Sequence, residues 1–266
     1  MTLATAWIRN SGGIEELLVA SDSRLRFGCA WDCCPKILVL PRSDSVICFA
    51  GDTMYAYPMM IQLQHAITMH HGLMSRAIDL TDLRGHVLRI FNGMQNWIHD
   101  LPANQSVPEE PAVLFILAGY SWKVRQFRIW TLHFDRISKK FQFKSATWHK
   151  GRTKGTKYFM FEGDHVVEAR ARLYKLLRER KKLTTGGLDM EPFEILRDMI
   201  RHGNFQTIGG PPQIVKVYQH MNNRPYSVYW PDRAAGTLTC MGRPLLNYEK
   251  AQFMCLDPDT LTVEQP

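Results

Sequence analysis

The sequence predicts an α+β fold, a four-layer αββα sandwich in which two antiparallel sheets lie between helical layers. Three observations support this prediction. Apolar stretches of strand length are interrupted twice by a pair of helical segments. Short turns join neighbouring strands, as is typical of antiparallel hairpins. A parallel sheet would instead alternate one strand with one helix, and this sequence does not do so.

Two hairpins are expected at the start of the chain. The apolar stretches 3–8 and 14–21 are separated by a turn that contains Asn-Ser-Gly-Gly. The stretches 36–40 and 45–50 are separated by "PRSD", whose Pro and Asp are typical turn residues. Four short strands are therefore predicted before the first helix.

Helical periodicity begins after these strands. Apolar residues recur at helical spacing between Thr53 and about Arg76, so one long helix is predicted there. Asp79 or Thr81 is expected to cap a second helix, whose apolar stripe extends to Ile98. The Pro-rich segment 102–111 is interpreted as a loop within one domain.

The second half repeats this order. Its predicted strands are 112–120, 124–134, 140–148 and 157–163, followed by helices at 164–180 and 191–202 and by strands at 213–220, 226–230 and 237–241. On the third predicted helix, Val167, Ala171, Tyr174 and Leu177 are expected to form the apolar side. Residues 1–231 are assigned to one domain, and 232–266 to a C-terminal extension of unknown role.

The composition is that of an ordinary globular protein, with 45% apolar and 22% charged residues. No apolar run approaches the roughly 18–20 residues that span a bilayer, and no secretory leader is present. A cytoplasmic protein without a membrane partner is expected. Three of the six cysteines cluster in "CAWDCC", but no second Cys/His pair follows at ligand spacing. Reduced thiols are therefore predicted, with neither a metal site nor a cofactor.

The net charge of +8 raises the question of a nucleic-acid partner. The basic residues gather in two stretches, 149–157 and 178–182. No nucleic-acid-binding motif accompanies them, and Gly and Thr between the charges of the first indicate a loop. A solvated surface is favoured over a nucleic-acid interface.

The amino end carries the main candidate for chemistry. Thr2 follows Met1 directly, and an initiator Met is usually removed before so small a residue. A threonine with a hydroxyl and a free α-amine would then begin the chain. Polar residues follow at three further points, where "VASDSR" contains Asp22, "PKILVL" contains Lys36 and "CFAGDT" contains Gly51.

In this order, the four residues resemble the motifs of the proteasome family of N-terminal-nucleophile (Ntn) hydrolases, most closely the bacterial HslV-type threonine peptidases. The resemblance covers roughly the first 75 residues. It implies the Ntn-hydrolase fold and cleavage of peptide bonds through an acyl-enzyme on Thr2. It also implies a peptide or unfolded-protein substrate and a homo-oligomeric ring. HslV-type rings depend on an ATP-driven unfoldase, and the sequence does not show whether such a partner applies here.

The residue types suit this chemistry. The α-amine, with an unperturbed pKa of about 7.7–8.0, can take the proton of the Thr2 hydroxyl. Lys36 would depress the pKa of that amine and stabilise the alkoxide, while Asp22 would neutralise and hold Lys36. The N–H of Gly51, before the first helix, would bind the oxyanion.

Two positions depart from the family pattern. Glu162 in "FEGDH" stands where a serine is usual, and is either a proton carrier or hydrogen-bond partner in its place or a carboxylate that caps a helix. Pro212 or Gln213 stands where a late aspartate usually supports the amine. These departures motivate a second hypothesis beside the hydrolase, a proteasome-like subunit that has a structural or interaction role and turns over no substrate.

Overall fold

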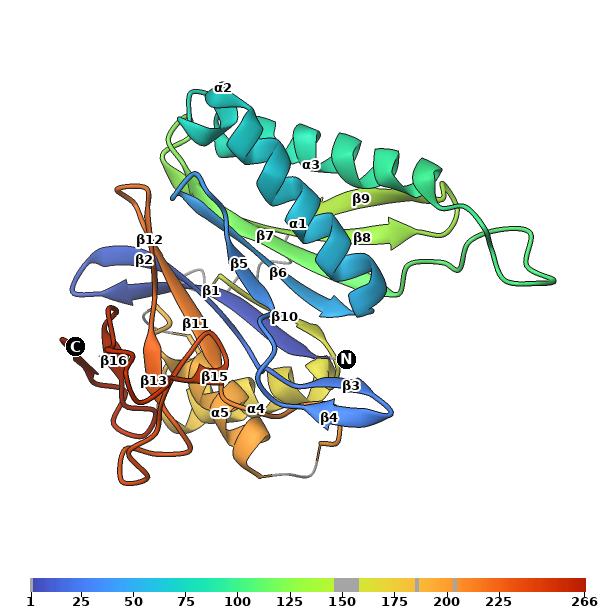
Figure 1. Ribbon diagram of the computed structural model, residues 1–266. Coiled ribbons are helices and arrows are strands. Elements are labelled where there is room, and N and C mark those ends of the chain that lie inside the picture. Colours follow the sequence, from blue (N-terminus) through green and yellow to red (C-terminus); the bar gives the residue numbers. More distant parts are fainter. Residues whose placement is uncertain (1, 146–157, 185–186, 203–204) are drawn as a thin grey trace.

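The computed structural model describes residues 2–145, 158–184, 187–202 and 205–266 (Figure 1). This part of the chain has a mixed architecture of five α-helices and several sheets. Neighbouring strands are antiparallel, with the exception of one parallel pair, β13 and β16. The predicted class, α+β with antiparallel sheets, is confirmed at this level.

The first sheet contains the amino-terminal strand in an interior position. Its order is β10 (Phe159–Gly163), β1 (Leu3–Ser11), β2 (Ile14–Ser21), β11 (Gln213–Tyr218) and β12 (Asn222–Pro225). The predicted first hairpin is confirmed, because β1 pairs with β2 up to Ser11 and Ile14. Its two turn residues, Gly12 and Gly13, have φ of 59° and 85°, angles that glycine adopts more readily than residues with a Cβ.

The second sheet contains the predicted second hairpin. Its order is β5 (Ile37–Val39), β6 (Ser45–Gly51), β7 (Val113–Ser121), β8 (Gln126–Asp135) and β9 (Lys140–Ser145). Strands β5 and β6 pair antiparallel, as predicted. A two-stranded ribbon that was not predicted, β3 (Leu25–Phe27) with β4 (Cys29–Trp31), lies between the two hairpins in the chain.

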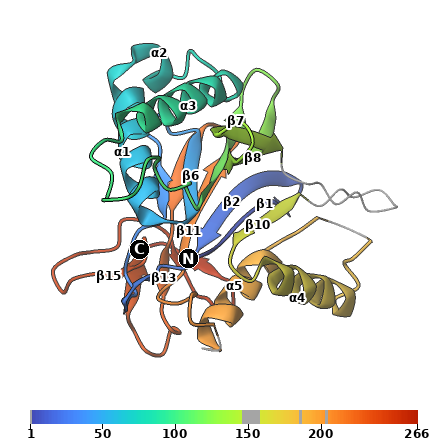
Figure 2. The same cartoon turned by 90° about the vertical axis from the view of Figure 1, so that its right-hand side faces the viewer.

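Buried residues from both sheets meet in one apolar cluster. Alternate residues of β1 and β2, such as Ala4, Ala6 and Val19, pack there with Val46 and Ile116 of the second sheet. The other faces of the two sheets pack against helices (Figures 1 and 2). Each sheet is therefore apolar on both faces.

The helices on the second sheet are α1 (Thr53–Met69), α2 (His71–Met74) and α3 (Leu80–Met94), followed by a 3-10 turn at Gln95–Trp97. The prediction of one helix to about Arg76 is wrong, because the backbone is extended at His70. The His70 ring accepts a hydrogen bond from Leu73 N and so begins α2. Asp79 caps α3, one of the two predicted caps, and the α-helix ends at Met94, before Ile98.

The helices on the first sheet are α4 (Val166–Glu179) and α5 (Glu191–Arg201). The predicted apolar side of α4 is wrong, since Val167 is 84% exposed and Ala171 is also exposed. The buried side is Ala169, Leu173 and Leu177, whose spacing of four residues keeps them on one face toward the sheet.

The basic stretch 178–182 lies at the end of α4. Arg180 binds Glu194 at 2.6 Å, and Lys182 binds Glu191 at 2.7 Å, so two of its cations join α4 to the first turn of α5. The other basic stretch, 149–157, lies outside the described residues.

The last part of the chain adds a third sheet. Its order is β15 (Arg243–Pro244), β14 (Leu238–Cys240), β13 (Ser227–Tyr229), β16 (Cys255–Leu256) and β17 (Val263–Glu264). Strand β13 precedes the proposed domain boundary at 231, and its partners β14 and β16 follow it. Val228 and Leu256 belong to the same core cluster as α4 and α5.

The six cysteines are free thiols, and Cys34, Cys48 and Cys255 are buried. Among the described residues, no helix combines the length and apolar character needed to cross a membrane.

Candidate active site

Four of the five predicted site residues lie at strand ends. Thr2 precedes β1, Asp22 follows β2, Lys36 precedes β5, and Gly51 ends β6. Glu162 lies in β10, next to the end of that strand. Because β1 lies between β2 and β10, the amino end is enclosed by strands on both sides, as Figure 2 shows near its centre.

Asp22 and Lys36 form a buried ion pair. Lys36 Nζ lies 2.8 Å from Asp22 Oδ1, and both side chains are 0% exposed. The carboxylate also accepts backbone hydrogen bonds from Leu3 (3.1 Å), Arg24 (3.2 Å) and Gly209 (3.1 Å). Complete burial raises the pKa of the Asp22 carboxyl, and Lys36 and the backbone N–H groups act in the opposite direction. The bond from Leu3 links this pair to the residue next to Thr2.

Thr2 is fully buried, and its Oγ1 has no hydrogen-bond partner among the described residues. A buried hydroxyl without a partner costs about 1–3 kcal/mol. Side chains alternate along β1, and Ala4 and Ala6 face the cluster between the sheets, so Thr2 is directed toward the same side. The unpaired hydroxyl therefore lies where the space between the sheets ends.

Gly51 occupies a position that only glycine suits. Its φ is +113°, and a Cβ would lie 2.2 Å from the carbonyl oxygen of Ala112. Phe49 N donates to Lys36 O, and alternate residues of a strand direct their N–H groups to the same side. The N–H of Gly51 is therefore directed past the end of β5, toward the side on which Lys36 lies.

Glu162 faces the second sheet. Its backbone is opposite Ala4 of β1, and its carboxylate accepts a hydrogen bond from Thr131 Oγ1 at 3.3 Å. Burial raises the pKa of the Glu162 carboxyl, an effect that the Thr131 hydroxyl and nearby cations oppose. Glu162 is not a capping residue of α4, because that helix begins after His165 without a side-chain cap.

Gln213, one of two residues between which the sequence left the choice open, belongs to this site. Its Oε1 accepts from Lys36 N at 2.9 Å and from Ile37 N at 3.3 Å, and its Nε2 donates to Cys34 O at 2.8 Å. Gln213 therefore holds the backbone of Lys36 rather than a threonine amine.

Sequence reasoning did not identify Asp164. Its N–H donates to Thr2 O at 2.7 Å, so Asp164 lies opposite Thr2 in the continuation of the pairing between β10 and β1. Its Oδ2 is buried without a partner among the described residues. The one signal in the sequence was the position of Asp164, two residues after Glu162 and just beyond the end of β10.

A pocket of about 330 Å³ adjoins these residues. Gly51, Gly163 and Asp164 line one part of it, and His133 and Arg136 from the end of β8 line another. Burial, with a contribution from Lys144, lowers the pKa of the His133 ring below its usual value.

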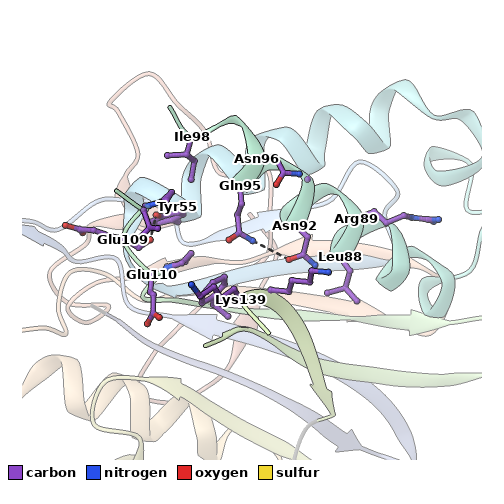
Figure 3. Close-up of a pocket in the computed structure, with 16 residues that line it drawn as sticks. Tyr55, Leu88, Arg89, Asn92, Gln95, Asn96, Ile98, Glu109, Glu110 and Lys139 are labelled. Carbon is purple, nitrogen blue, oxygen red and sulfur yellow. Dashed lines mark hydrogen bonds between the residues drawn. The ribbon is translucent and has the colours of Figure 1, made fainter. Parts of the chain in front are cut away.

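Two larger pockets lie elsewhere. One of about 770 Å³ lies between α3 and the 107–111 segment, and none of the five predicted residues lines it (Figure 3). Gln95 donates to Asn92 at 3.3 Å in its centre. Another pocket, of about 810 Å³, is mainly apolar and includes Met54 and Trp97. The residues that line these two pockets include neither Thr2 nor the Asp22–Lys36 pair.

A scan against protein-family models found no match for this chain, and a search of the curated proteins found none. The chemistry is therefore inferred from the arrangement itself. A hydroxyl, a buried cation held by a carboxylate, and a directed backbone N–H can together support nucleophilic attack on a carbonyl group.

Proposed function

We propose that this protein is a proteasome-like N-terminal threonine hydrolase, which cleaves peptide bonds after removal of Met1. The observation that carries the proposal is the buried Asp22–Lys36 pair, whose carboxylate also binds the N–H of Leu3, next to Thr2. Burial of a charged lysine lowers the stability of a fold unless nearby groups compensate the charge, so such a residue is often retained for a function.

In the proposed mechanism, the α-amine of Thr2 takes the proton of the Thr2 hydroxyl. The oxygen then attacks the peptide carbonyl, and the N–H of Gly51 stabilises the oxyanion. The C–N bond breaks, the amine proton passes to the leaving nitrogen, and an ester on Thr2 remains. A water that gives its proton to the same amine hydrolyses that ester.

The fold we propose is the four-layer αββα sandwich of the Ntn hydrolases. Its support is the packing of both sheets against each other and of helices against their other faces. An interior strand at the amino end also suits an N-terminal nucleophile, because neighbouring strands can supply groups on both sides of it.

We further propose a cytoplasmic homo-oligomeric ring that takes peptides or unfolded protein as substrate. An ATP-driven unfoldase that delivers unfolded protein to the ring is a partner compatible with this proposal. The large exposed apolar side chains Met54, Ile61 and Met69 of α1 provide a surface on which a second subunit could pack.

The proposal is tested by covalent labelling of Thr2. Protein purified from its native host is expected to lack Met1 by intact mass. It is expected to form an adduct with a peptide epoxyketone, which needs both the hydroxyl and the amine, and Thr2→Ala is expected to form none.

Two results would contradict the hydrolase. Retention of Met1 in the native host would leave the amine acylated and favour the structural subunit instead. Labelling that persists in Thr2→Ala would place the reactive group elsewhere. Thr5→Ala is a matched control, since Thr5 is equally buried in β1 but its hydroxyl already donates to Met160 O.

A further inference from the structure

Asp164 holds the position across from the amine that the proposed mechanism uses. Even-numbered residues of β1 bond to β10, since Ile8 N donates to Tyr158 O and Thr2 O accepts from Asp164 N. In an antiparallel pair, a residue directs both its C=O and its N–H to the same partner. The nitrogen of Thr2 is therefore directed toward the backbone carbonyl of Asp164, the residue whose carboxylate the following argument concerns.

Asp164 is half-buried and lines the pocket beside Thr2, and one oxygen of its carboxylate lacks the partner that a buried polar atom needs. Its Oδ2 has no hydrogen bond among the described residues, although its backbone is fixed against Thr2 at 2.7 Å. A buried carboxylate oxygen without a partner is costly, and a positive charge close by removes that cost. Removal of Met1 creates such a charge, because the Thr2 amine becomes a protonatable group.

We propose that Asp164 is the carboxylate that binds the α-ammonium group of Thr2 once Met1 has been removed. The inference rests on the proposed function for the exposure of that amine. In acylation the amine accepts the hydroxyl proton and becomes an ammonium ion, and Asp164 stabilises this form.

Other ionisable groups face this position. Asp22 and Lys36 approach from the ends of β2 and β5, and their charges balance each other. Glu162 lies two residues earlier in β10 and is bonded to Thr131. His133 of β8 and Arg136, which follows that strand, line the adjoining pocket, and Arg136 is paired with Glu110. Asp164 is the carboxylate among these whose backbone bonds to Thr2 itself.

The test measures the titration of the amine in the full chain that begins at Thr2. This chain is released from a cleavable amino-terminal fusion, so that the free amine does not depend on trimming by the host. Threonine with a ¹³C-labelled methyl group reports the titration through the chemical shift of Thr2. Asp164→Asn is expected to lower the midpoint by at least about one pH unit, as loss of an adjacent opposite charge does.

Asp164→Ser provides a second neutral variant in case Asp164→Asn folds poorly, and the same fall is expected. Glu168→Gln removes an exposed carboxylate of α4 that is paired with Arg172, and its midpoint is expected to match the wild type. An unchanged midpoint in either folded Asp164 variant would overturn the proposal.

The same samples separate this inference from the proposed function. If the wild type forms the epoxyketone adduct but its midpoint does not depend on Asp164, the inference fails and the hydrolase stands. If the midpoint depends on Asp164 but no adduct forms, the amine site stands and the hydrolase fails.

Discussion

Two fully buried ion pairs lie at opposite ends of the hairpin formed by β5 and β6. Lys36 precedes β5 and pairs with Asp22, while Arg42 and Asp44 pair within the turn that follows β5. All four side chains are 0% exposed. The two pairs are equally buried but differ in the contacts around them. This difference suits Arg42 and Asp44 to holding a turn, and Asp22 and Lys36 to the chemistry proposed above.

The Arg42–Asp44 pair is local. The guanidinium makes two parallel contacts with the carboxylate, at 2.7 and 2.8 Å, and also donates to Ile78 O at 2.9 Å. Arginine keeps its proton in proteins, and its planar fork fixes one geometry. Arg42 and Asp44 are only two positions apart, so this pair fixes the turn between β5 and β6. The bond to Ile78 O joins that turn to the segment before α3.

The Asp22–Lys36 pair joins distant segments through one contact of 2.8 Å. Its carboxylate collects N–H groups from Leu3, Arg24 and Gly209, which are far apart in the chain. Lysine is a compact charge with three donors, so it can serve a neighbour as well as its partner. An unpartnered hydroxyl nearby, that of Thr2, completes the contrast. Burial of an ion pair alone therefore does not point to an active site, and the proposal made for Asp22 and Lys36 depends on the groups around them.

The largest expected effect on stability and labelling comes from removing the cation of the ion pair at each end of the β5–β6 hairpin. Lys36→Met and Arg42→Met should each lower the free energy of unfolding by about 3–5 kcal/mol, because each leaves a buried carboxylate unpaired. Only Lys36→Met should slow formation of the epoxyketone adduct, by about 10²–10⁴ per folded molecule. Urea unfolding and intact mass measure the two quantities. If folded Lys36→Met forms the adduct at the rate of the wild type, the proposed functional difference between the two ion pairs is wrong.

The second comparison uses a glycine at each end. A Cβ at Gly51 would lie 2.2 Å from Ala112 O, and a Cβ at Gly119 would lie 2.5 Å from Asp44 O. Gly51→Ala and Gly119→Ala should each cost about 1–3 kcal/mol of stability. Gly51→Ala should also slow labelling by about 10²–10³, since it displaces the N–H proposed to bind the oxyanion. Equal labelling by both variants would argue against that role.

A smaller effect is expected from the amides that brace each end. Gln213 bonds to the backbone of Lys36, and Asn223 donates to Ser45 O at 2.8 Å. Gln213→Leu and Asn223→Leu should each cost about 1–3 kcal/mol, because backbone groups lose their partners. Labelling should fall roughly tenfold in Gln213→Leu through misplacement of Lys36, and stay unchanged in Asn223→Leu. Loss of labelling in both variants would indicate a global effect.

The smallest effect is a pH dependence of opposite sign at the two ends. Burial raises the pKa of Glu162, so this group favours the fold at low pH, and its contribution is lost as the pH rises through the raised pKa. Glu162→Gln should therefore be more stable than wild type at neutral pH and equal to it in acid. Urea unfolding at several pH values measures this.

Asp79, near the turn pair, provides the opposite case. Burial disfavours its ionised form, but hydrogen bonds from Thr81, Ser121 and Lys123 outweigh burial and lower its pKa. Its contribution is present above the unfolded pKa and is lost as the pH falls through the lowered one. Asp79→Asn should be less stable than wild type at neutral pH, with the difference shrinking in acid. The same sign for both variants would contradict this account.

Much of the fold could be predicted from local signals. The two glycines after Ser11 require a tight hairpin, and Asp79 has the residue type and position of a helix cap. The break at His70 could not be predicted, because the apolar spacing continues across it and the cap is a histidine ring. Strands of two or three residues, such as β15 and β16, are too short to show any periodicity.

The candidate site was predictable where residue type and order were informative. Asp22 and Lys36 could be singled out from the sequence, and the structure brings them together. Asp164 had only its spacing from Glu162 as a signal, because its proposed role depends on the pairing of β1 with a strand some 160 residues later. Gln213 was left undecided beside Pro212, since only tertiary contacts show which of them reaches Lys36.

The interior place of β1 also constrains when the amino end can be trimmed. Thr2 is enclosed only after β10 pairs with β1, and β10 begins at Phe159. At about 5–20 residues per second, a ribosome needs roughly 8–30 seconds to make the intervening chain. If Met1 is removed as proposed, an aminopeptidase that acts on the nascent polypeptide during this interval meets an amino end whose neighbour on one side, β10, has not yet been made.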